Sequence, residues 1–206
     1  MRQDGDVKHA VATTPPKATR RKRVPKEQAQ ARLIAATIAL LRRMPFDQVG
    51  NQVICAEADL NPSTILQHFG TLDALLGAAT QDLVTRHVAE TVGSGAYPTS
   101  LNNADVDLRN RLVAWMLLKG ADPAVFRTDI MKNEDMLAFQ TESLQTGKRT
   151  AIAWTTMASM LIEAYSIFQE THHLSGDEAD DVLALVVTLR SRLPEVEQSL
   201  GWADTP

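Results

Sequence analysis

Hydrophobic residues recur at intervals of three and four through most of this chain, a spacing that places them on one face of an α-helix. Two stretches show it clearly, with repeated positions at Leu33, Thr37, Leu40, Leu41 and Met44, and at Leu72, Leu75, Leu76, Ala79 and Leu83. The two-residue alternation of a half-buried strand is hard to find. The pattern therefore predicts an all-α protein.

Prolines, glycines and capping residues divide this pattern into about nine helices. The expected ranges are about 26–43, 48 or 51 to 58, 61–69, 72–92, 105–119, 123–132, 134–146, 148–172 and 177–193. Asn61 is a favoured N-cap and Pro62 suits the first helical position, so the third helix has a well-specified start. Ser175 and Glu178 have the spacing of a capping box, and Pro194 is expected to end the last long helix.

The net charge of −4 conceals two halves of opposite sign. Residues 1–50 contain 11 Lys and Arg against 4 Asp and Glu, whereas residues 51–206 contain 10 against 21. A basic amino-terminal end on an acidic body is typical of a protein that meets a polyanion at that end. A solvated tail that only aids solubility is an equally good interpretation of the charge alone. Residues 1–24 have no apolar core of a secretory signal, so we interpret them as a flexible basic arm.

Cysteine content and hydropathy indicate the compartment. The single cysteine, Cys55, excludes an internal disulfide and is compatible with a reducing interior, so we expect a cytoplasmic protein. The longest apolar-leaning run, Ala151–Ile162, is shorter than the ~18 residues that a membrane span needs. No membrane crossing is expected.

The second and third expected helices are short and are separated by only a few residues. Ile65 and Phe69 lie four positions apart on the third helix and are expected to face the core with Ile54 and Leu60. Two polar pairs then lie outside: Ser63 with Gln67, and Thr64 with His68. Hydroxyl and amide groups bond phosphates and base edges, so this face suits a nucleic-acid groove and the pair is a helix-turn-helix candidate.

At this point residues 26–83 resemble the DNA-binding region of the TetR family of bacterial transcription regulators. The resemblance rests on "LIAATIALLRR", on Phe46, on "VICAEADLNPSTILQHFG" and on "LDALLGAAT". A family pattern close to "IAERAGVSKGTLYHHFGSKEEL" matches this chain at Ile54, Ala58, Leu60, Thr64, His68 and Phe69. The resemblance implies a three-helix DNA-binding domain over residues 25–71 and a helical effector-binding and dimerisation domain over residues 72–206.

Three residues depart from that family pattern. Asp59 stands where the turn usually has glycine, although aspartate tolerates left-handed backbone angles better than most residues. Leu66 replaces the usual tyrosine and Leu72 the usual lysine, so two habitual phosphate contacts are missing. Either the basic arm compensates by lying in an adjacent minor groove, or the helix-turn-helix binds DNA poorly. We favour the first alternative, because the four charges of residues 20–23 outnumber the two lost contacts.

The resemblance implies a ligand-responsive regulator, most simply a repressor, that binds a palindromic DNA operator as a homodimer and is released by a small-molecule effector. The alternative is a helical dimeric sensor or scaffold with a degenerate helix-turn-helix. The candidate DNA contacts are Asn61, Pro62, Ser63, Thr64, Gln67, His68, Arg20, Arg21, Lys22 and Arg23. The candidate effector-pocket residues are Trp115, Met116, Met131, Met136, Phe139, Trp154, Met157 and Tyr165. The candidate dimer contacts are Met160, Leu161, Phe168, Val182, Leu185, Val186 and Leu189.

Neither catalysis nor a cofactor or metal site is expected. His172 and His173 are adjacent, so they do not share a helix face for binding a metal. The stretch Thr146–Thr150, "TGKRT", lacks the upstream glycine and the preceding strand of a phosphate-binding loop. Cys55 is expected to be a packed small side chain and not a redox sensor.

Overall fold

The computed structural model describes residues 24–94, 103–127, 134–172 and 175–203. Within these ranges every regular element is helical, which confirms the all-α class. The α-helices are α1 (Lys26–Leu41), α2 (Asn51–Glu57), α3 (Ser63–Phe69), α4 (Leu72–Ser94), α5 (Ala104–Leu118), α6 (Glu134–Leu144), α7 (Lys148–His172), α8 (Gly176–Ser191) and α9 (Leu193–Ser199). Two short 3₁₀ segments, η1 (Phe46–Gln48) and η2 (Pro123–Phe126), lie between them.

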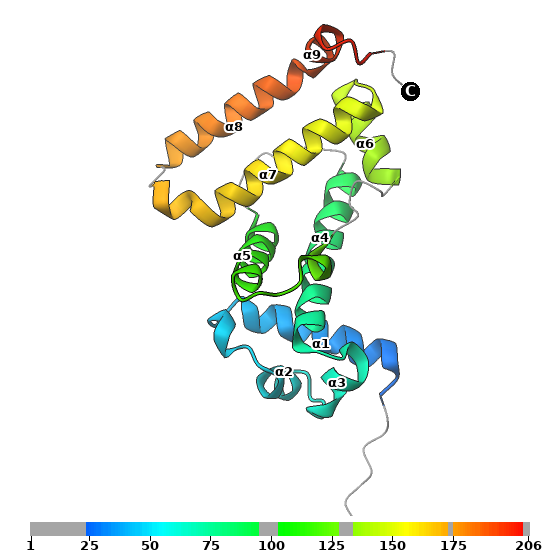
Figure 1. Cartoon of the computed structure of the whole chain (residues 1–206), viewed down its shortest axis with the longest axis vertical. Coiled ribbons are helices and arrows are strands. Elements are labelled where there is room, and N and C mark those ends of the chain that lie inside the picture. Colours follow the sequence, from blue (N-terminus) through cyan, green and yellow to red (C-terminus); the bar gives the residue numbers. More distant parts are fainter. Residues whose placement is uncertain (1–23, 95–102, 128–133, 173–174, 204–206) are drawn as a thin grey trace, which may run out of the picture.

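The molecule is elongated, with α1, α2 and α3 at one end and α8 and α9 at the other (Figure 1). The long helix α4 starts beside α3 and leads toward α6 and α7 (Figure 1). Helix α5 packs on both α4 and α7. One helix therefore connects the end that carries α3 with the body of the molecule.

The largest hydrophobic core lies around α1 and the first half of α4. Leu33, Ile54, Ile65, Leu75 and Leu112 are at most 1% exposed, and they come from α1, α2, α3, α4 and α5 in turn. Burying one leucine or isoleucine side chain contributes about 1.5–3 kcal/mol. The three- and four-residue periodicity predicted from the sequence is confirmed here. The same core contains residues from both sides of the expected domain boundary between residues 71 and 72.

A smaller core lies between α6, α7 and α9. It contains Leu144, Ala151, Trp154 and Leu193, all of which are buried. Helix α8 has no buried residue, although its partly buried Val186 packs against this core. Helix α8 is therefore attached mainly through its carboxyl-terminal half and through α9.

Helix α4 approaches η2 unusually closely at Gly77. A Cβ atom built on Gly77 would lie 2.4 Å from Cγ1 of Val125 and 3.0 Å from its carbonyl oxygen. Atoms do not approach that closely without displacement, so the contact requires a residue without a side chain. Among the glycines of the described residues, a Cβ atom would meet its closest neighbour at Gly77.

One predicted helix range is wrong, and one short helix is missing from the prediction. Instead of a helix over 123–132, residues 123–126 form a single 3₁₀ turn, Arg127 is extended, and 128–133 lie outside the described residues. Asp122 caps that turn by accepting a hydrogen bond from the Ala124 N–H at 2.8 Å. The last long helix, α8, does end just before Pro194, at Ser191. A short helix that was not predicted, α9, follows it and holds Pro194 in its first turn, where a missing N–H costs nothing.

Other helix ends agree with the prediction. The capping box is confirmed: the Ser175 hydroxyl accepts from the Glu178 N–H, and the Glu178 carboxylate accepts from the Ser175 N–H at 2.8 Å. Helix α3 begins at Ser63, and Asn61 still caps it, because the Asn61 Oδ1 accepts from the Ser63 N–H at 3.0 Å. The boundary differs by two residues while the capping contact is the expected one.

The apolar character of α7 extends further than the run Ala151–Ile162. Among the described residues, one segment, Lys148–Gln169, is long and apolar enough to span a bilayer by length and composition alone, with a mean hydropathy of 1.2. Only 22% of its most apolar window is buried. Much of the apolar surface of α7 is therefore exposed in the single chain.

Candidate nucleic-acid interface

Helices α2 and α3 are joined by a tight turn that depends on a left-handed residue. Asp59 has a φ of 51°, a left-handed angle that aspartate tolerates better than most residues. The turn closes when the Leu60 N–H donates to the Cys55 carbonyl at 2.9 Å. Cys55 itself is fully buried, as predicted, and burial raises the pKa of its thiol. The thiol therefore stays protonated and unreactive at neutral pH.

Helix α3 is anchored by one deeply buried side chain. Ile65 is 1% exposed, and the partly buried Leu60 and Phe69 pack against the same core. The side-chain amide of Gln30 in α1 also donates to the carbonyl of His68 at 3.4 Å. These contacts hold one face of α3 against α1 and leave the opposite face free.

The outward face of α3 is only partly the one expected. Asn61, Pro62, Ser63 and Gln67 are exposed, whereas Thr64 and His68 are half-buried. Thr64 and His68 flank Ile65 on the side that turns toward the core, and Leu66 lies on the opposite side. Leu66 is 71% exposed, so an apolar side chain belongs to this surface together with the polar ones.

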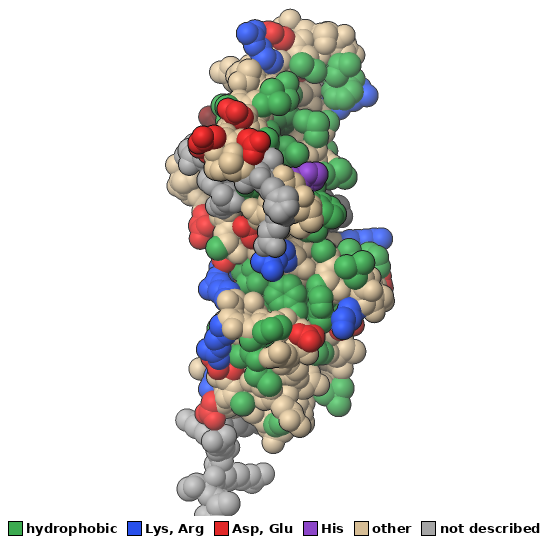
Figure 2. Space-filling view, turned by 90° about the vertical axis from the view of Figure 1, so that its left-hand side faces the viewer, with side chains coloured by type: hydrophobic (Ala, Val, Ile, Leu, Met, Phe, Trp, Pro, Cys, Tyr) green, Lys and Arg blue, Asp and Glu red, His purple; other side chains and the backbone are tan. Residues whose placement is uncertain are grey.

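Charges are balanced around this surface. Residues 24–71 contain four Lys and Arg and four Asp and Glu, so their net charge is zero. All three arginines are engaged: Arg43 lies 2.5 Å from the carboxylate of Glu57, Arg32 lies 3.8 Å from that of Asp59, and Arg42 forms an ion pair with Asp105. Figure 2 shows basic, acidic and apolar side chains interspersed over this end of the molecule. The predicted contacts Arg20, Arg21, Lys22 and Arg23 lie outside the described residues.

The passage from α3 to α4 is short and well defined. Gly70 has a φ of 77°, which ends α3, and the Thr71 hydroxyl then accepts from the Ala74 N–H at 3.0 Å. Helix α4 starts at Leu72, which packs partly buried against the core that holds Ile65. A displacement of the first turn of α4 therefore reaches α3 directly.

A cavity of about 290 Å³ lies further along α4, between α4, α5 and α7. Its walls are largely apolar, with Leu83 and Val84 from α4, Val106 from α5, and Met160 and Ile162 from α7. Its polar lining residues are His87, Asp105, Arg109, Asn110, Thr156, Ser159 and Glu163. A concave, mostly apolar space with polar groups at its edge is the usual form of a small-molecule site.

A polar network at the α5–α7 contact adjoins this cavity. Nη1 of Arg109 donates to Glu163 at 2.5 Å and to the side-chain oxygen of Asn110 at 2.8 Å. The buried Asn110 donates to Ser166 at 3.2 Å, and the Ser166 hydroxyl lies 2.6 Å from the carboxylate of Asp107. Nε of Arg109 is buried and has no hydrogen-bond partner among the described residues.

His87 lines the cavity from α4 and is largely uncharged at neutral pH. Burial lowers the pKa of the His87 imidazole, and the nearby carboxylates of Glu90 and Asp105 oppose that shift without reversing it. Asp105 itself forms an ion pair with Arg42, which does not line the cavity. The charges around the cavity are thus compensated in pairs.

The residues predicted for an effector pocket are not gathered in this cavity. Trp115 and Met116 belong to the large core, where the ring of Trp115 meets that of Phe46 at 5.9 Å, and Trp154 belongs to the small core. Met136 is buried, Phe139 and Tyr165 are half-buried, Met157 is 54% exposed, and Met131 lies outside the described residues. No local signal marks the cavity residues, because the apolar ones continue ordinary helical stripes and the polar ones are spread over α4, α5 and α7.

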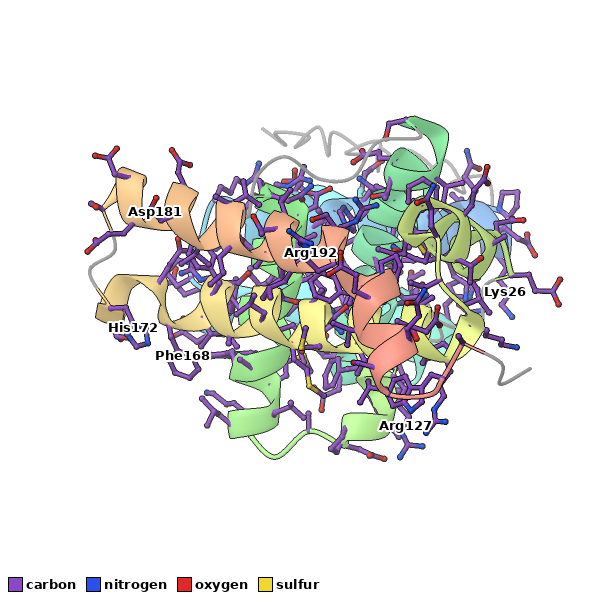
Figure 3. The ribbon with its side chains drawn as sticks, turned by 90° about the horizontal axis from the view of Figure 1, so that it is seen from above. Lys26, Arg127, Phe168, His172, Asp181 and Arg192 are labelled. Atoms are coloured by element: carbon purple, nitrogen blue, oxygen red, sulfur yellow. The ribbon has the colours of Figure 1, made fainter. Side chains whose placement is uncertain are left out.

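Most of the residues predicted for a dimer are accessible in the single chain. Met160, Leu161, Phe168, Leu185 and Leu189 are 41–64% exposed, and Val182 and Val186 are half-buried. Figure 3 shows α7 and α8 side by side, with Phe168 near the carboxyl end of α7 and Asp181 near the start of α8. Apolar side chains also gather in the upper part of Figure 2, where these two helices lie.

The described residues contain no group of three or more His, Cys, Asp and Glu side chains that could hold a metal ion. No family model matches the sequence, and no curated protein matches it. The features that bear on function are therefore the geometry of α2 and α3, the cavity, and the exposed apolar residues of α7 and α8.

Proposed function

We propose that this protein is a ligand-responsive transcriptional regulator of the TetR type, a repressor in its simplest form. In this proposal α2, the turn at Asp59 and α3 form a helix-turn-helix. The protein acts in the cytoplasm as a homodimer on a palindromic DNA operator, and a small-molecule effector releases it.

The outward face of α3 is the observation that carries the proposal. Ile65 anchors the helix in the core, so Ser63, Leu66 and Gln67 are presented together to solvent. Gln67 can form paired hydrogen bonds with an adenine edge, Ser63 can bond a base or a phosphate, and Leu66 can contact a thymine methyl group. A rigidly held helix with such a face suits the major groove.

The exposed apolar surface of α7 and α8 supports a dimer. Single large hydrophobic residues are often exposed, but a contiguous apolar surface marks an interaction site. A second copy of the chain, related by a two-fold axis, would cover Met160, Phe168 and Leu185 with their own counterparts. The same symmetry would give each half of a palindromic operator one α3.

The cavity supports the effector part of the proposal. It is lined by Leu83, Val84 and His87 on α4, and the first turn of the same helix packs beside α3. A molecule that displaces this part of α4 would change the position of α3, and in a dimer the separation of the two α3 helices. Ligand and operator would then compete through one helix.

Selection of bound duplexes from a random DNA library tests the proposal, with the full-length protein at low and moderate salt. Enrichment of a palindromic sequence is the expected result. Salt-sensitive binding without sequence preference would overturn specific regulation, because it would arise from phosphate contacts alone.

A second candidate function is a dimeric small-molecule sensor or scaffold that does not bind specific DNA. The zero net charge of residues 24–71 favours it, together with the ion pairs that engage Arg32 and Arg43. In that case the library selection would enrich no sequence, while ligand binding in the cavity would persist.

A further inference from the structure

We infer that the cavity between α4, α5 and α7 takes an uncharged, mainly apolar molecule that carries a carbonyl-type oxygen, and that this oxygen accepts a hydrogen bond from Arg109. The inference deepens the proposed function, because it names the chemical class of the effector. It rests on that proposal only for the identification of the cavity as the effector site.

The size and the walls of the cavity indicate a small apolar ligand. Its volume of about 290 Å³ lies at the lower end of the range of about 300–1,000 Å³ for small-molecule sites. Leu83, Val84, Val106 and Ile162 provide apolar contact from three helices. An extended polar ligand would lose its hydration against these side chains without gaining partners.

The paired charges at the polar end of the cavity disfavour a charged ligand. Arg109 is only 13% exposed and is paired with Glu163 at 2.5 Å, so neither charge is left uncompensated. Asp105 is paired with Arg42 outside the cavity lining. An anion would have to displace Glu163 and would also face Asp105, whereas a cation would lie beside Arg109. Either adds an uncompensated charge to a partly desolvated site.

The guanidinium of Arg109 indicates what the ligand must supply. Arg109 lines the cavity, and its hydrogen bonds to Glu163 and Asn110 are both made by Nη1. Arginine has donors and no acceptor, so only an acceptor atom satisfies it. An ammonium group has no acceptor, while an amide, ester or ketone oxygen has one and brings no charge. An uncharged carbonyl-type ligand therefore meets both conditions.

Three ligands with the same eight-carbon chain test the inference: octanamide, octanoate and octylamine, titrated calorimetrically into the full-length protein at pH 7.5. At that pH octanoate is an anion and octylamine a cation. We expect octanamide to bind at least about tenfold more tightly than either. Tighter binding of octanoate or octylamine would overturn the inference, as would the absence of octanamide binding.

Two variants locate the binding site. The double variant Arg109→Met with Glu163→Gln removes the donor and keeps the cavity uncharged, and it should weaken octanamide binding about tenfold. Arg111→Met, on an exposed position of α5 that does not line the cavity, is the matched control and should leave binding unchanged. Equal affinities of these two variants for octanamide would contradict the role of Arg109.

A third variant provides a readout that does not depend on losing binding. Glu163→Gln alone leaves Arg109 uncompensated, so it should shift the preference from octanamide toward octanoate. An unchanged preference would contradict the charge argument. All these titrations are made without DNA, so failure of the ligand prediction and failure of operator binding are observed separately.

Discussion

The carboxylate of Glu197 in α9 lies 2.7 Å from the hydroxyl of Thr150 in α7 and accepts a hydrogen bond from it. The same oxygen accepts from the backbone N–H of Gly147 at 2.8 Å, and Glu197 is 7% exposed. A residue near the end of the chain thus satisfies donors at the start of α7, where a negative charge is favourable.

Removal of this carboxylate should destabilise the fold. In Glu197→Ala, the Gly147 N–H and the Thr150 hydroxyl lose their buried acceptor, so we expect the free energy of unfolding to fall by about 1–3 kcal/mol in urea denaturation. Glu195→Ala is the matched control, because the Glu195–Arg192 pair is exposed and should contribute less than about 0.5 kcal/mol. Equal effects of both variants would show that the Glu197 contact contributes nothing.

Two substitutions of Asp59, in the turn before α3, should affect stability in opposite ways. Because Asp59 has a positive φ, Asp59→Gly should keep or raise the free energy of unfolding, and Asp59→Val should lower it by about 1–2 kcal/mol. Asp47→Gly makes the same change at a residue without a positive φ and should be destabilising. A destabilised Asp59→Gly variant would contradict the backbone argument. Chemical denaturation measures all three.

In the proposed regulator, the exposed Leu66 is expected to contact the methyl group of a thymine in the operator. If Leu66 contacts a thymine, replacing that thymine by uracil in the selected operator should weaken binding about fourfold, since a buried methyl-sized group contributes about 0.8 kcal/mol. The Leu66→Ala variant should lose the difference between the two duplexes. Leu118→Ala, on a 90% exposed leucine of α5, should retain it. Fluorescence anisotropy measures the six affinities of the three proteins for the two duplexes.

The basic arm should account for most of the salt dependence of DNA binding. Each neutralised phosphate contributes about 0.9 to the slope of log affinity against log salt, so deletion of residues 1–24 should lower that slope by up to about 3.6 for the four charges of residues 20–23. Replacement of these four residues alone by alanine should reproduce most of the loss. An unchanged affinity and slope after deletion would exclude the arm from the interface.

His87 predicts a dependence of stability on pH. Burial holds the folded-state pKa of His87 below the unfolded value near 6.5, so protonation favours unfolding. The associated stability is fully present above the unfolded pKa and is lost as the pH falls through the lowered folded value. Urea midpoints between pH 5 and 8 should therefore vary less in His87→Gln than in the natural chain. His172→Gln, at an exposed position of α7, is the matched control for the substitution itself.

Helix positions could be predicted because each depends on local spacing. Leu33, Leu75 and Leu83 recur with the helical period, and they are 0–1% exposed in the structure. The segment after Pro194 could not be predicted in this way. Whether a helix continues beyond a proline depends on what it packs against, and Glu197 finds its partner at Gly147, 50 residues away.

In the candidate site, too, some features follow from the local sequence and others only from the packing of the helices. The inward position of Ile65 and the left-handed angle of Asp59 follow from their own helix and turn, so both could be expected. Thr64 and His68 are half-buried because α1 approaches from one side, which no local pattern indicates. The cavity combines residues of α4, α5 and α7, and its position is determined only when these helices pack together.

The close contact between Gly77 and Val125 would allow α4 to tilt about this point but not to slide along its axis. Sliding α4 by one residue would bring a Cβ atom against Val125, whereas tilting about Gly77 leaves that contact in place. Leu72 lies five residues to one side of this pivot and His87 ten residues to the other, or about 7.5 Å and 15 Å along the axis. A sideways displacement at the cavity would therefore reach α3 with opposite sign and about half the amplitude.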